Sequence, residues 1–319
     1  MTGSGSTVAV LGGSWFIGHA IVEALLADGH RLMVLNRGVT PVKYSGNVTL
    51  VQSDRNDRAG HEELLSRLEA DWLVDVTAYG PEHTRSVVDA CGGRVRGLIH
   101  ISTMSVYRWP VPCPIPENFP LETDPANQYG FQKAGCERVL QSIPGEVLNW
   151  IILRLPAVYG PNDPVSRERY FIGNLFQGRP IMIPLKPFLC QNIFVRDVAK
   201  AVCRVIRGSS HPASVYNIAG EPFTLEEYVE RLGRLVGREP NLVRSSGSAL
   251  RQARADAGNL PYFAEGDFLM DTKRIRTELG FEPDYTLDRA LPPTVKWIRE
   301  NPAPKSMTWG LPWEEMLSS

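Results

Sequence analysis

The chain has 319 residues, of which 43% are hydrophobic and 22% charged, and its formal net charge is -1. This size suffices for one large or two modest hydrophobic cores. Because a charge near zero does not attract nucleic acid or a membrane surface, and no apolar run reaches the length of a membrane span, we expect neither as a partner.

The first expected element is an apolar strand at residues 7–11, which leads into the glycine-rich stretch at residues 12–18. A helical pattern follows and ends at Asp28 and Gly29. In a strand, turn and helix of this kind, glycines let the backbone approach a pyrophosphate, and the helix N-terminus directs N–H groups at it. We therefore expect a dinucleotide cofactor at this turn. Its residues are Gly12, Gly13, Ser14, Trp15, Phe16, Ile17 and Gly18.

The second expected strand, residues 31–35, ends in Asn36 and Arg37, with no acidic residue to accept a hydrogen bond from an adenosine 2′-hydroxyl. Arg37 suits a 2′-phosphate instead, through charge-assisted hydrogen bonds. The sequence therefore favours NADP as the cofactor, with NAD as the alternative. Asp54 follows the third strand, and we expect it to reach the adenine amino group, with Arg55 beside it.

Strands and helices continue to alternate along the chain. Strands are expected at residues 48–52, 72–77, 95–101 and 149–155, and helices at 61–70 and 84–91. This alternation predicts an α/β fold with a doubly wound parallel sheet and ligands at the carboxyl ends of its strands. Thr77, Ala78, Tyr79 and residues 102–109 would then share the mouth of the cofactor cleft.

Tyr129 and Lys133 lie four residues apart in a stretch with helical spacing, so their side chains share one helical face. An ammonium group beside a phenol lowers the pKa of the phenol and lets it exchange protons nearer neutrality. Thr103, at the end of a buried strand, can orient a substrate oxygen, whereas His100 is expected to be a satisfied interior histidine. The alternative is a solvated helix face, but the strand, the threonine and the upstream turn favour catalysis.

The organisation changes after residue 165. We expect a dinucleotide-binding Rossmann domain at residues 1–165, with returns at about 192–219, and a smaller substrate-binding lobe and tail at 166–319. Its last helix, residues 287–300, contains Pro292 and Pro293, which must kink or restart it. In the tail, Trp309 and Trp313 are expected to pack on the body or across a dimer. A proline-rich stretch at residues 109–116 is expected to wall the substrate pocket or to act as a rigid connector.

The five cysteines are far apart in the sequence, and no two of them form a Cys-x-x-Cys pair. This spacing argues against a disulfide framework and against a zinc site, so we expect reduced thiols, no metal and a cytoplasmic location. His30, His61 and His83 have no metal-ligand spacing and are expected at the surface. The first six residues lack the basic segment and apolar core of a secretion signal.

Together these residues resemble the extended short-chain dehydrogenase/reductases, the group that holds nucleotide-sugar epimerases and dehydratases. The resemblance spans residues 8–297 and is carried by the turn, Thr103 with Tyr107, Tyr129 with Lys133, and the segments 154–161, 195–197 and 271–280. It implies that Thr103, Tyr129 and Lys133 are catalytic, with Lys133 also contacting the nicotinamide ribose. The cofactor contacts expected outside the turn are Asn36, Arg37, Asp54, Arg55, Thr77, Ala78, Tyr79, Lys133, Leu155, Pro156 and Val158.

Four departures from the family pattern sharpen this reading. Trp15 replaces the middle glycine of the turn, so its side chain must leave the phosphate cleft; this form is similar to a branch that reads Gly-Gly-Thr/Ser-x-Phe-Ile-Gly. Met104 and Ser105 stand where dehydratases carry Asp-Glu and where decarboxylating members need the glutamate. Cys190 and Ala264 stand where nucleotide-sugar enzymes place arginines that clamp a diphosphate, a group that is costly to bury without cations. The candidates to replace those cations are Arg167, Arg169, Arg251 and Arg254.

The chemistry that remains is hydride exchange between a secondary alcohol and its ketone. A retained cofactor would give epimerisation, and an exchanging cofactor would give a ketoreductase or dehydrogenase. We expect a small-molecule substrate, a sugar or sugar-nucleotide, and a homodimer. The alternatives are a ketoreductase of a non-sugar natural product and a non-catalytic relative that binds RNA or senses nucleotides. The expected substrate contacts are Ser105, Tyr79, Trp109, Arg169 and Phe188.

Overall fold

The computed structural model describes residues 5–208, 213–245 and 266–301, and the chain divides into two compact units. Unit 1 contains residues 1–156, 195–218 and 271–282, and unit 2 contains residues 157–194, 219–270 and 283–319. The sequence placed the first division after residue 165. In the structure it follows Pro156, because β7 (Ala157–Tyr159) pairs with β9 (Cys190–Phe194) of unit 2. Positions 251, 254, 264, 309 and 313 lie outside the described residues.

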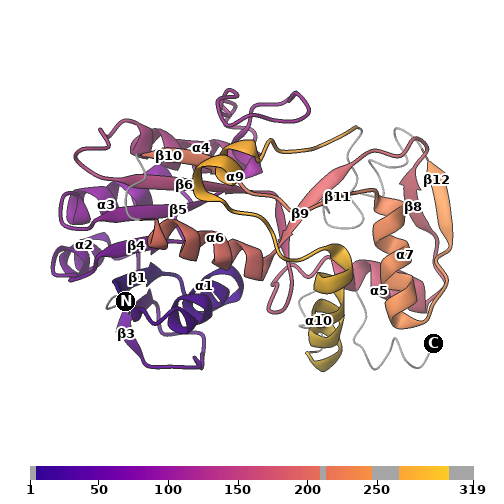
Figure 1. Ribbon diagram of the computed structural model, residues 1–319, viewed down its shortest axis with the longest axis horizontal. Coiled ribbons are helices and arrows are strands. Elements are labelled where there is room, and N and C mark those ends of the chain that lie inside the picture. The colour runs from indigo at the N-terminus through magenta and orange to yellow at the C-terminus, as the bar shows by residue number, and fades with distance from the viewer. Residues whose placement is uncertain (1–4, 209–212, 246–265, 302–319) are drawn as a thin grey trace. The chain divides into compact units, whose positions relative to one another are not determined.

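Unit 1 is built on a seven-stranded sheet in the order β10-β6-β5-β4-β1-β2-β3, and all its pairs are parallel (Figure 1). Its strands are β1 (Thr7–Leu11), β2 (Arg31–Asn36), β3 (Val48–Gln52), β4 (Trp72–Asp75), β5 (Gly97–Thr103), β6 (Trp150–Leu155) and β10 (Ser214–Asn217). From β1 the chain proceeds outward through β2 and β3 and then returns to β4 on the other side of β1. This strand order confirms the predicted doubly wound sheet. Because ligands bind where the strand order reverses, the cleft is expected at the carboxyl ends of β1 and β4.

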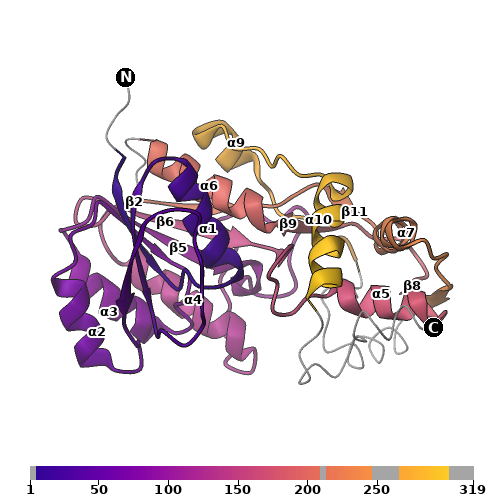
Figure 2. The same cartoon turned by 90° about the horizontal axis from the view of Figure 1, so that it is seen from below.

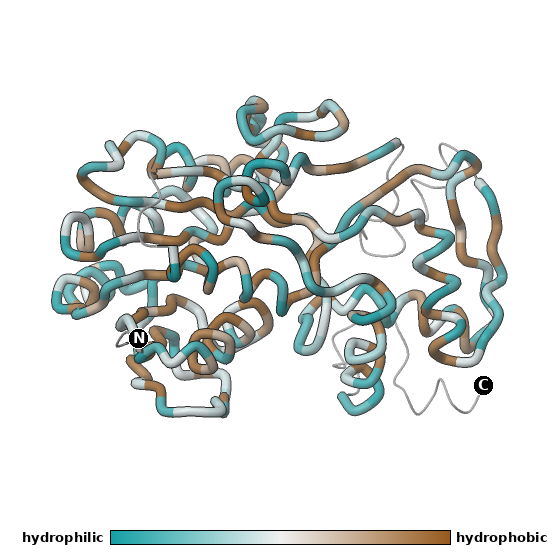
Figure 3. Tube along the Cα trace, viewed as in Figure 1, coloured by the Kyte–Doolittle hydropathy of each residue, from teal (hydrophilic) through white to brown (hydrophobic). Residues whose placement is uncertain are grey.

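Helices cover both faces of this sheet. Figure 2 shows α1 (Phe16–Ala27) and α6 (Val195–Arg207) on one face, and α2 (Arg58–Ser66), α3 (Pro81–Cys91) and α4 (Gln128–Gln141) on the other. Strands between two layers of helices must be apolar on both sides, and Figure 3 shows the hydrophobic colour along the central strands. All residues of β4 and β6 are buried, and only Thr103, the last residue of β5, is partly exposed.

Residues 271–282 also belong to unit 1, a return that the sequence did not predict. Their helix, α9 (Lys273–Leu279), lies against β10. The guanidinium of Arg274 donates to the carbonyl oxygen of Val215 at 3.1 Å and to Ser214 Oγ at 3.1 Å. Pairing of this kind joins residues some sixty positions apart in sequence, so no local pattern reveals it.

A buried ion pair joins β6 to α4. Arg154 is 1% exposed and Glu137 is fully buried, and their side chains form hydrogen bonds at 2.5 to 3.1 Å. Ser102 Oγ of β5 donates to the same carboxylate at 2.6 Å, and the Arg154 guanidinium lies 4.7 Å from the ring centre of Tyr107. Burial lowers the pKa of Arg154, but the Glu137 carboxylate outweighs this effect and raises it above its ordinary value. Arg154 therefore stays charged in the interior.

We predict that Arg154→Met destabilises unit 1 by about 3–5 kcal/mol, because it leaves the Glu137 carboxylate buried without its cation. Urea unfolding of both proteins, followed by tryptophan fluorescence, measures the difference. The matched control is the double variant Arg154→Met, Glu137→Leu, which removes both charges and should recover much of the loss. A change of less than about 1 kcal/mol in the single variant would contradict the role given to this pair.

Unit 2 has two small sheets and three described helices. The sheets are β11 (Pro222–Phe223), β9 and β7 in one, and β12 (Leu242–Ser245) with β8 (Ile181–Pro184) in the other. The helices are α5 (Glu168–Phe176), α7 (Leu225–Val236) and α10 (Leu287–Glu300). Their core is rich in aromatic rings. The rings of Phe171 and Tyr228 pack edge to face with their centres 6.0 Å apart, and the rings of Tyr228 and Phe223 stack with their centres 5.1 Å apart.

Helix α10 continues through Pro292 and Pro293; of the predicted kink or restart, the structure excludes the restart. A proline at these positions removes the hydrogen bonds to the carbonyl groups of Asp288 and Arg289. Both residues are exposed, and water can therefore satisfy their carbonyl oxygens. The apolar face of the helix, including Leu291, Val295 and Ile298, is buried and holds the helix in place.

Two acids are buried at the start of α5. Asp163 is 3% exposed and Glu168 is fully buried, where it accepts a hydrogen bond from the hydroxyl of Tyr228. Burial raises the pKa of Asp163 to about 7, and the nearby Glu168 adds to the rise. Burial also raises the pKa of Glu168. The pair therefore takes up protons when unit 2 folds.

Because the pKa of Asp163 is higher in the folded chain, its contribution to stability is present below the unfolded value and is lost as pH rises through about 7. We predict that Asp163→Asn, which cannot ionise, reduces the fall in melting temperature between about pH 6 and pH 8. Melting curves measured by circular dichroism over this range test the prediction. Asp288→Asn, on the exposed face of α10, is the control and should keep the wild-type slope. An unchanged slope in Asp163→Asn would refute it.

Candidate active site

The turn after β1 depends on glycine at two positions. Gly12 has φ +90°, and a Cβ there would lie 2.1 Å from Thr77 Cγ2. A Cβ on Gly18 would lie 1.9 Å from the carbonyl oxygen of Gly12. The start of α1 therefore packs directly on the backbone of the turn, and neither position has room for a side chain.

Helix α1 begins at Phe16 with no side-chain cap from its N-cap residue, Trp15. Uncapped N–H groups at a helix N-terminus favour an anion. The side chain of Trp15 is 52% exposed, and the residue lines the pocket next to Gly12 and Ser14. Phe16 has φ +43°, a conformation that non-glycine residues rarely adopt and that often marks functional sites.

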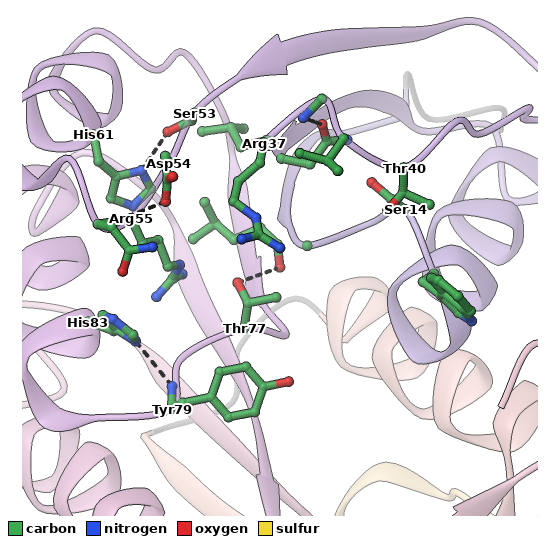
Figure 4. Close-up of a pocket in the computed structure, with 18 residues that line it drawn as sticks. Ser14, Arg37, Thr40, Ser53, Asp54, Arg55, His61, Thr77, Tyr79 and His83 are labelled. Carbon is green, nitrogen blue, oxygen red and sulfur yellow. Dashed lines mark hydrogen bonds between the residues drawn. The ribbon is translucent and has the colours of Figure 1, made fainter. Parts of the chain in front are cut away.

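A pocket of about 460 Å³ opens at the carboxyl ends of β1, β2 and β4 (Figure 4). Of the predicted cofactor residues, its lining includes Gly12, Ser14, Trp15, Asn36, Arg37, Asp54, Arg55, Thr77 and Tyr79. Gly13, Phe16, Ile17 and Gly18 belong to the turn and to the first turn of α1 behind it. Three segments far apart in sequence therefore meet around one cavity, at the switch point of the sheet.

Two arginines line the pocket in different ways. Figure 4 shows the side chain of Arg37 extending into the cavity toward Thr77. The guanidinium of Arg55 instead forms an ion pair with Asp75 at 2.6 Å, and both groups are largely buried. Asp54, the residue expected to reach the adenine, is exposed at the pocket edge. Arg37 is therefore the arginine that points into the pocket.

The prediction that His61 lies at the surface was wrong. His61 is 3% exposed, and its Nδ1 lies 2.6 Å from Ser53 Oγ at the pocket wall. Burial, then the charge of Arg55, lowers the pKa of His61. The helical pattern of residues 61–70 placed His61 at the start of the helix, whereas α2 begins at Arg58 and turns the ring inward. His83 also lines the pocket, and its Nδ1 accepts a hydrogen bond from the Tyr79 backbone at 3.3 Å.

Thr103 is the last residue of β5 and is partly exposed. Its hydroxyl accepts a hydrogen bond from the Ser105 backbone N–H at 3.2 Å and lies 3.4 Å from Ser105 Oγ. These contacts hold the threonine side chain at the start of a short 3₁₀ helix (Met104–Val106). Thr103 is thus an ordered hydroxyl at the carboxyl edge of the sheet.

Lys133 lies on α4 and is 3% exposed. Its Nζ donates to the carbonyl oxygens of Ala78 and Ile101, both at 2.8 Å, and lies 3.2 Å from His100 Nε2. Burial lowers the pKa of Lys133. Lys133 is therefore anchored in the interior and does not lie on a solvated helix face, whereas Tyr129, four residues earlier, is 50% exposed.

The other predicted residues lie elsewhere in the two units. Tyr79 and Trp109 are exposed side chains of unit 1, at 58% and 53%, and Leu155 and Pro156 are buried at the end of β6. Val158 is buried in β7 of unit 2, where Phe188 packs in the aromatic core. The buried guanidinium of Arg169 donates to the carbonyl oxygen of Asn301 and stacks on Trp297. Arg169 and Phe188 are thus buried and packed in the interior of unit 2.

The described residues hold no group of three or more metal-ligating side chains, and all five cysteines are free thiols. No described helix combines the length and the apolar character needed to cross a membrane.

Comparison with known proteins identifies the family of this chain. Residues 8–219 match the NAD dependent epimerase/dehydratase family. The chain belongs to this family. The enzyme type predicted from the sequence, an oxidoreductase or epimerase of the extended short-chain dehydrogenase/reductase group, is thereby confirmed.

The relatives of this chain have names that describe different activities. The chain is 23% identical to the chloroplast stem-loop binding protein of 41 kDa b of Arabidopsis thaliana, over 89% of this chain and 77% of that protein. It is 22% identical to 2'-dehydrokanamycin reductase of Streptomyces kanamyceticus, over 84% of this chain and 74% of that enzyme. The crystal structure of UDP-glucose 4-epimerase with UDP-glucose from Thermotoga maritima superposes with a TM-score of 0.72 at 21% identity, over 92% and 99% of the two chains. At this identity the likeness shows the fold alone.

The residues of unit 1 fit a nicotinamide dinucleotide. The turn at Gly12 and Gly18 has no room for side chains, and the uncapped start of α1 can receive a pyrophosphate. Arg37 provides a cation at the end of β2, and the pocket has a volume suited to part of such a ligand. In this family member, the cofactor would be held by these residues and by Thr77 and Tyr79.

We predict that Gly18→Ala lowers the affinity for the nicotinamide dinucleotide about ten- to a hundredfold, because its Cβ displaces the Gly12 carbonyl at an overpacking cost of about 1–3 kcal/mol. Isothermal titration calorimetry with NADP+ and NAD+ measures the loss. The control is Gly46→Ala, in the loop before β3, where the nearest neighbour of the added methyl group is the flexible Leu26 side chain at 3.3 Å. Normal binding by Gly18→Ala would contradict the assigned turn.

Proposed function

We propose that this protein interconverts a secondary alcohol and its ketone on a sugar or sugar-nucleotide, with NADP as the preferred cofactor and NAD as the alternative. The proposal is carried by one observation: the glycine turn, Thr103 and the anchored Lys133 all belong to one sheet and its covering helices in unit 1. The turn and Thr103 follow the carboxyl ends of parallel strands, where α/β enzymes bind their ligands.

The residues of the chain have separate tasks in this reaction. Tyr129 moves the hydroxyl proton of the substrate, since a phenol can act as acid or base. The buried Lys133 favours the phenolate by its positive charge and also holds the cofactor ribose. Thr103 donates a hydrogen bond to the substrate oxygen on which charge develops. A bound nicotinamide supplies or accepts the hydride.

Dehydration and decarboxylation are not proposed. Met104 and Ser105 follow Thr103, so neither position provides the carboxyl group that either reaction requires there. This leaves two outcomes, epimerisation if the cofactor is retained and reduction or oxidation if it exchanges. Denaturing the purified protein and identifying any released nicotinamide cofactor and sugar nucleotide by mass spectrometry tests which applies. Retained NAD(P) supports the epimerase, and a protein free of both supports the exchanging reductase.

The sugar-nucleotide class draws support from relatives that act on or bind UDP-sugars. One feature favours a non-sugar ketone as the second candidate. Cys190 replaces an arginine of the diphosphate clamp, and its side chain is buried in the core of unit 2, where it donates to the Phe223 carbonyl. Burial raises the pKa of Cys190 to about 12, so no charge is available at this position. The (4-alkanoyl-5-oxo-2,5-dihydrofuran-3-yl)methyl phosphate reductase among the relatives has a substrate that is not a sugar, which is consistent with that alternative.

RNA binding is the candidate from a different class, and the stem-loop binding relative favours it. A net charge of -1 and the complete Thr103, Tyr129 and Lys133 set weigh against it. Salt-dependent binding of an RNA stem-loop, together with the absence of cofactor-dependent chemistry, would favour RNA binding as the function. The homodimer and the cytoplasmic location expected from the sequence stay predictions.

We predict that Arg37→Ala lowers the affinity for NADP+ about ten- to a hundredfold and leaves the affinity for NAD+ nearly unchanged, because charge-assisted hydrogen bonds contribute about 1.5–3 kcal/mol. Calorimetric titration with both cofactors measures the ratio. The matched control is Arg31→Ala at the opposite end of β2, where the guanidinium donates to Thr7 Oγ1. Equal losses for NADP+ and NAD+ in Arg37→Ala would refute 2′-phosphate recognition.

We predict that Tyr129→Phe lowers turnover at least about a hundredfold and leaves cofactor affinity intact, since only the proton-transferring hydroxyl is lost. The assay uses the substrate that analysis of the bound contents identifies, followed at the absorbance of reduced nicotinamide or by product chromatography. Tyr216→Phe, which removes a hydroxyl bonded to Glu278 next to α9, is the control. Near-normal turnover by Tyr129→Phe would remove this residue from the mechanism.

A further inference from the structure

Every N–H donor of the Lys133 ammonium has an acceptor inside unit 1. Two acceptors are the carbonyl oxygens of Ala78 and Ile101, each 2.8 Å from Nζ, and the other is His100 Nε2 at 3.2 Å. An ammonium group has three donors and no acceptor, so this set uses all of them. Because Lys133 is 3% exposed and His100 is 1% exposed, bulk water cannot replace any of these partners.

This contact determines the proton position on His100. A donor N–H from Lys133 requires an unprotonated Nε2, so the ring proton is on Nδ1. Burial, then the positive charge of Lys133, lowers the pKa of His100 well below its usual range, which keeps the ring neutral. Among the described residues Nδ1 has no hydrogen-bond partner, so the polar contact of this ring is with Lys133.

The nearby acids are already paired with other cations. Asp75 is the neighbour of His100 in the β4–β5 register, and its carboxylate binds Arg55 at 2.6 Å. Glu137 is one helical turn after Lys133 on α4, and it binds Arg154. In the part of the chain that the structure describes, His100 is therefore the side chain that accepts from Lys133.

We propose that His100 is a positioning residue that holds the third N–H of Lys133 until a ligand hydroxyl replaces it. This inference rests on the proposed function, in which Lys133 serves both Tyr129 and the cofactor ribose. A hydroxyl that binds Nζ must displace one of three acceptors. Two are backbone carbonyls next to β4 and in β5, whereas His100 provides the longest contact and the side-chain acceptor. His100 is thus the partner that gives way.

Nitrogen NMR of the protein labelled with ¹⁵N-histidine tests this arrangement without any substrate. The chain has six histidines, and the His100 signal is assigned by its absence in His100→Gln or, if that variant does not fold, by single replacement of the other five. In the cofactor-free protein we expect the proton on Nδ1 and a shift of Nε2 in Lys133→Met. Saturation with NADP+ should also move the Nε2 resonance. A proton on Nε2, or a resonance that neither change affects, would overturn the proposal.

Two variants then separate positioning from a structural role. His100→Gln keeps an acceptor near the place of Nε2, whereas His100→Leu keeps bulk and removes the acceptor. We expect His100→Leu to lower turnover about ten- to a hundredfold, by analogy with the loss of a partner that orients a metal ligand, and His100→Gln to restore most of it. Cys91→Ala, at the buried end of α3 where the thiol donates to the Leu65 carbonyl of α2, controls for lost core packing. Equal turnover in the Leu and Gln variants would overturn the positioning role.

The two proposals can fail separately. If the NMR results hold and no alcohol or ketone turns over, the Lys133–His100 contact stands and the proposed reaction falls. If turnover depends on Tyr129 but Lys133→Met does not shift the Nε2 resonance of His100, the proposed reaction stands and the role of His100 is refuted.

Discussion

Unit 1, which holds the candidate active site, depends on a buried ion pair between Arg154 and Glu137. The pair joins β6 to α4, and Ser102 of β5 donates to the same carboxylate. Because two charges in the interior are stable only when they remain together, the helix cannot slide along the sheet without breaking the pair. The residues at the end of β5 and those on the first turns of α4 therefore keep a constant relation. Catalysis by Thr103, Tyr129 and Lys133 would rest on that constancy.

Buried charges are also paired along the face of the sheet that α2, α3 and α4 cover. Asp75 is paired with Arg55, and Lys133 is satisfied by two carbonyls and His100. Each buried charge in this row has a specific partner, as the cost of burying charge requires. Unit 2 meets the same cost differently, because burial raises the pKa of both Asp163 and Glu168 and so favours their neutral forms.

Function in this family depends on what is placed around a shared core. The turn at residues 12–18 and the Tyr129–Lys133 spacing fit hydride exchange, while Met104, Ser105 and Cys190 lack the groups for dehydration, decarboxylation and diphosphate binding at those positions. In the proposed reaction Lys133 would link cofactor and proton chemistry, and its ammonium group is held by three contacts inside unit 1. A preorganised lysine loses little freedom on binding, which favours catalysis over mere recognition.

The sequence by itself determined the parallel sheet, the glycine turn, Arg37 at the end of β2 and the helical spacing of Tyr129 and Lys133. These features are local, since a strand followed by a turn and a helix is specified by neighbouring residues. Only the tertiary structure revealed the pairing of β7 with β9, the return of α9 to unit 1, the inward ring of His61, and the partners of Arg55, Arg154 and Lys133. Each of these contacts joins side chains or strands that are distant along the chain. Their energy comes from burial and charge pairing in the folded state, which no short stretch of residues encodes.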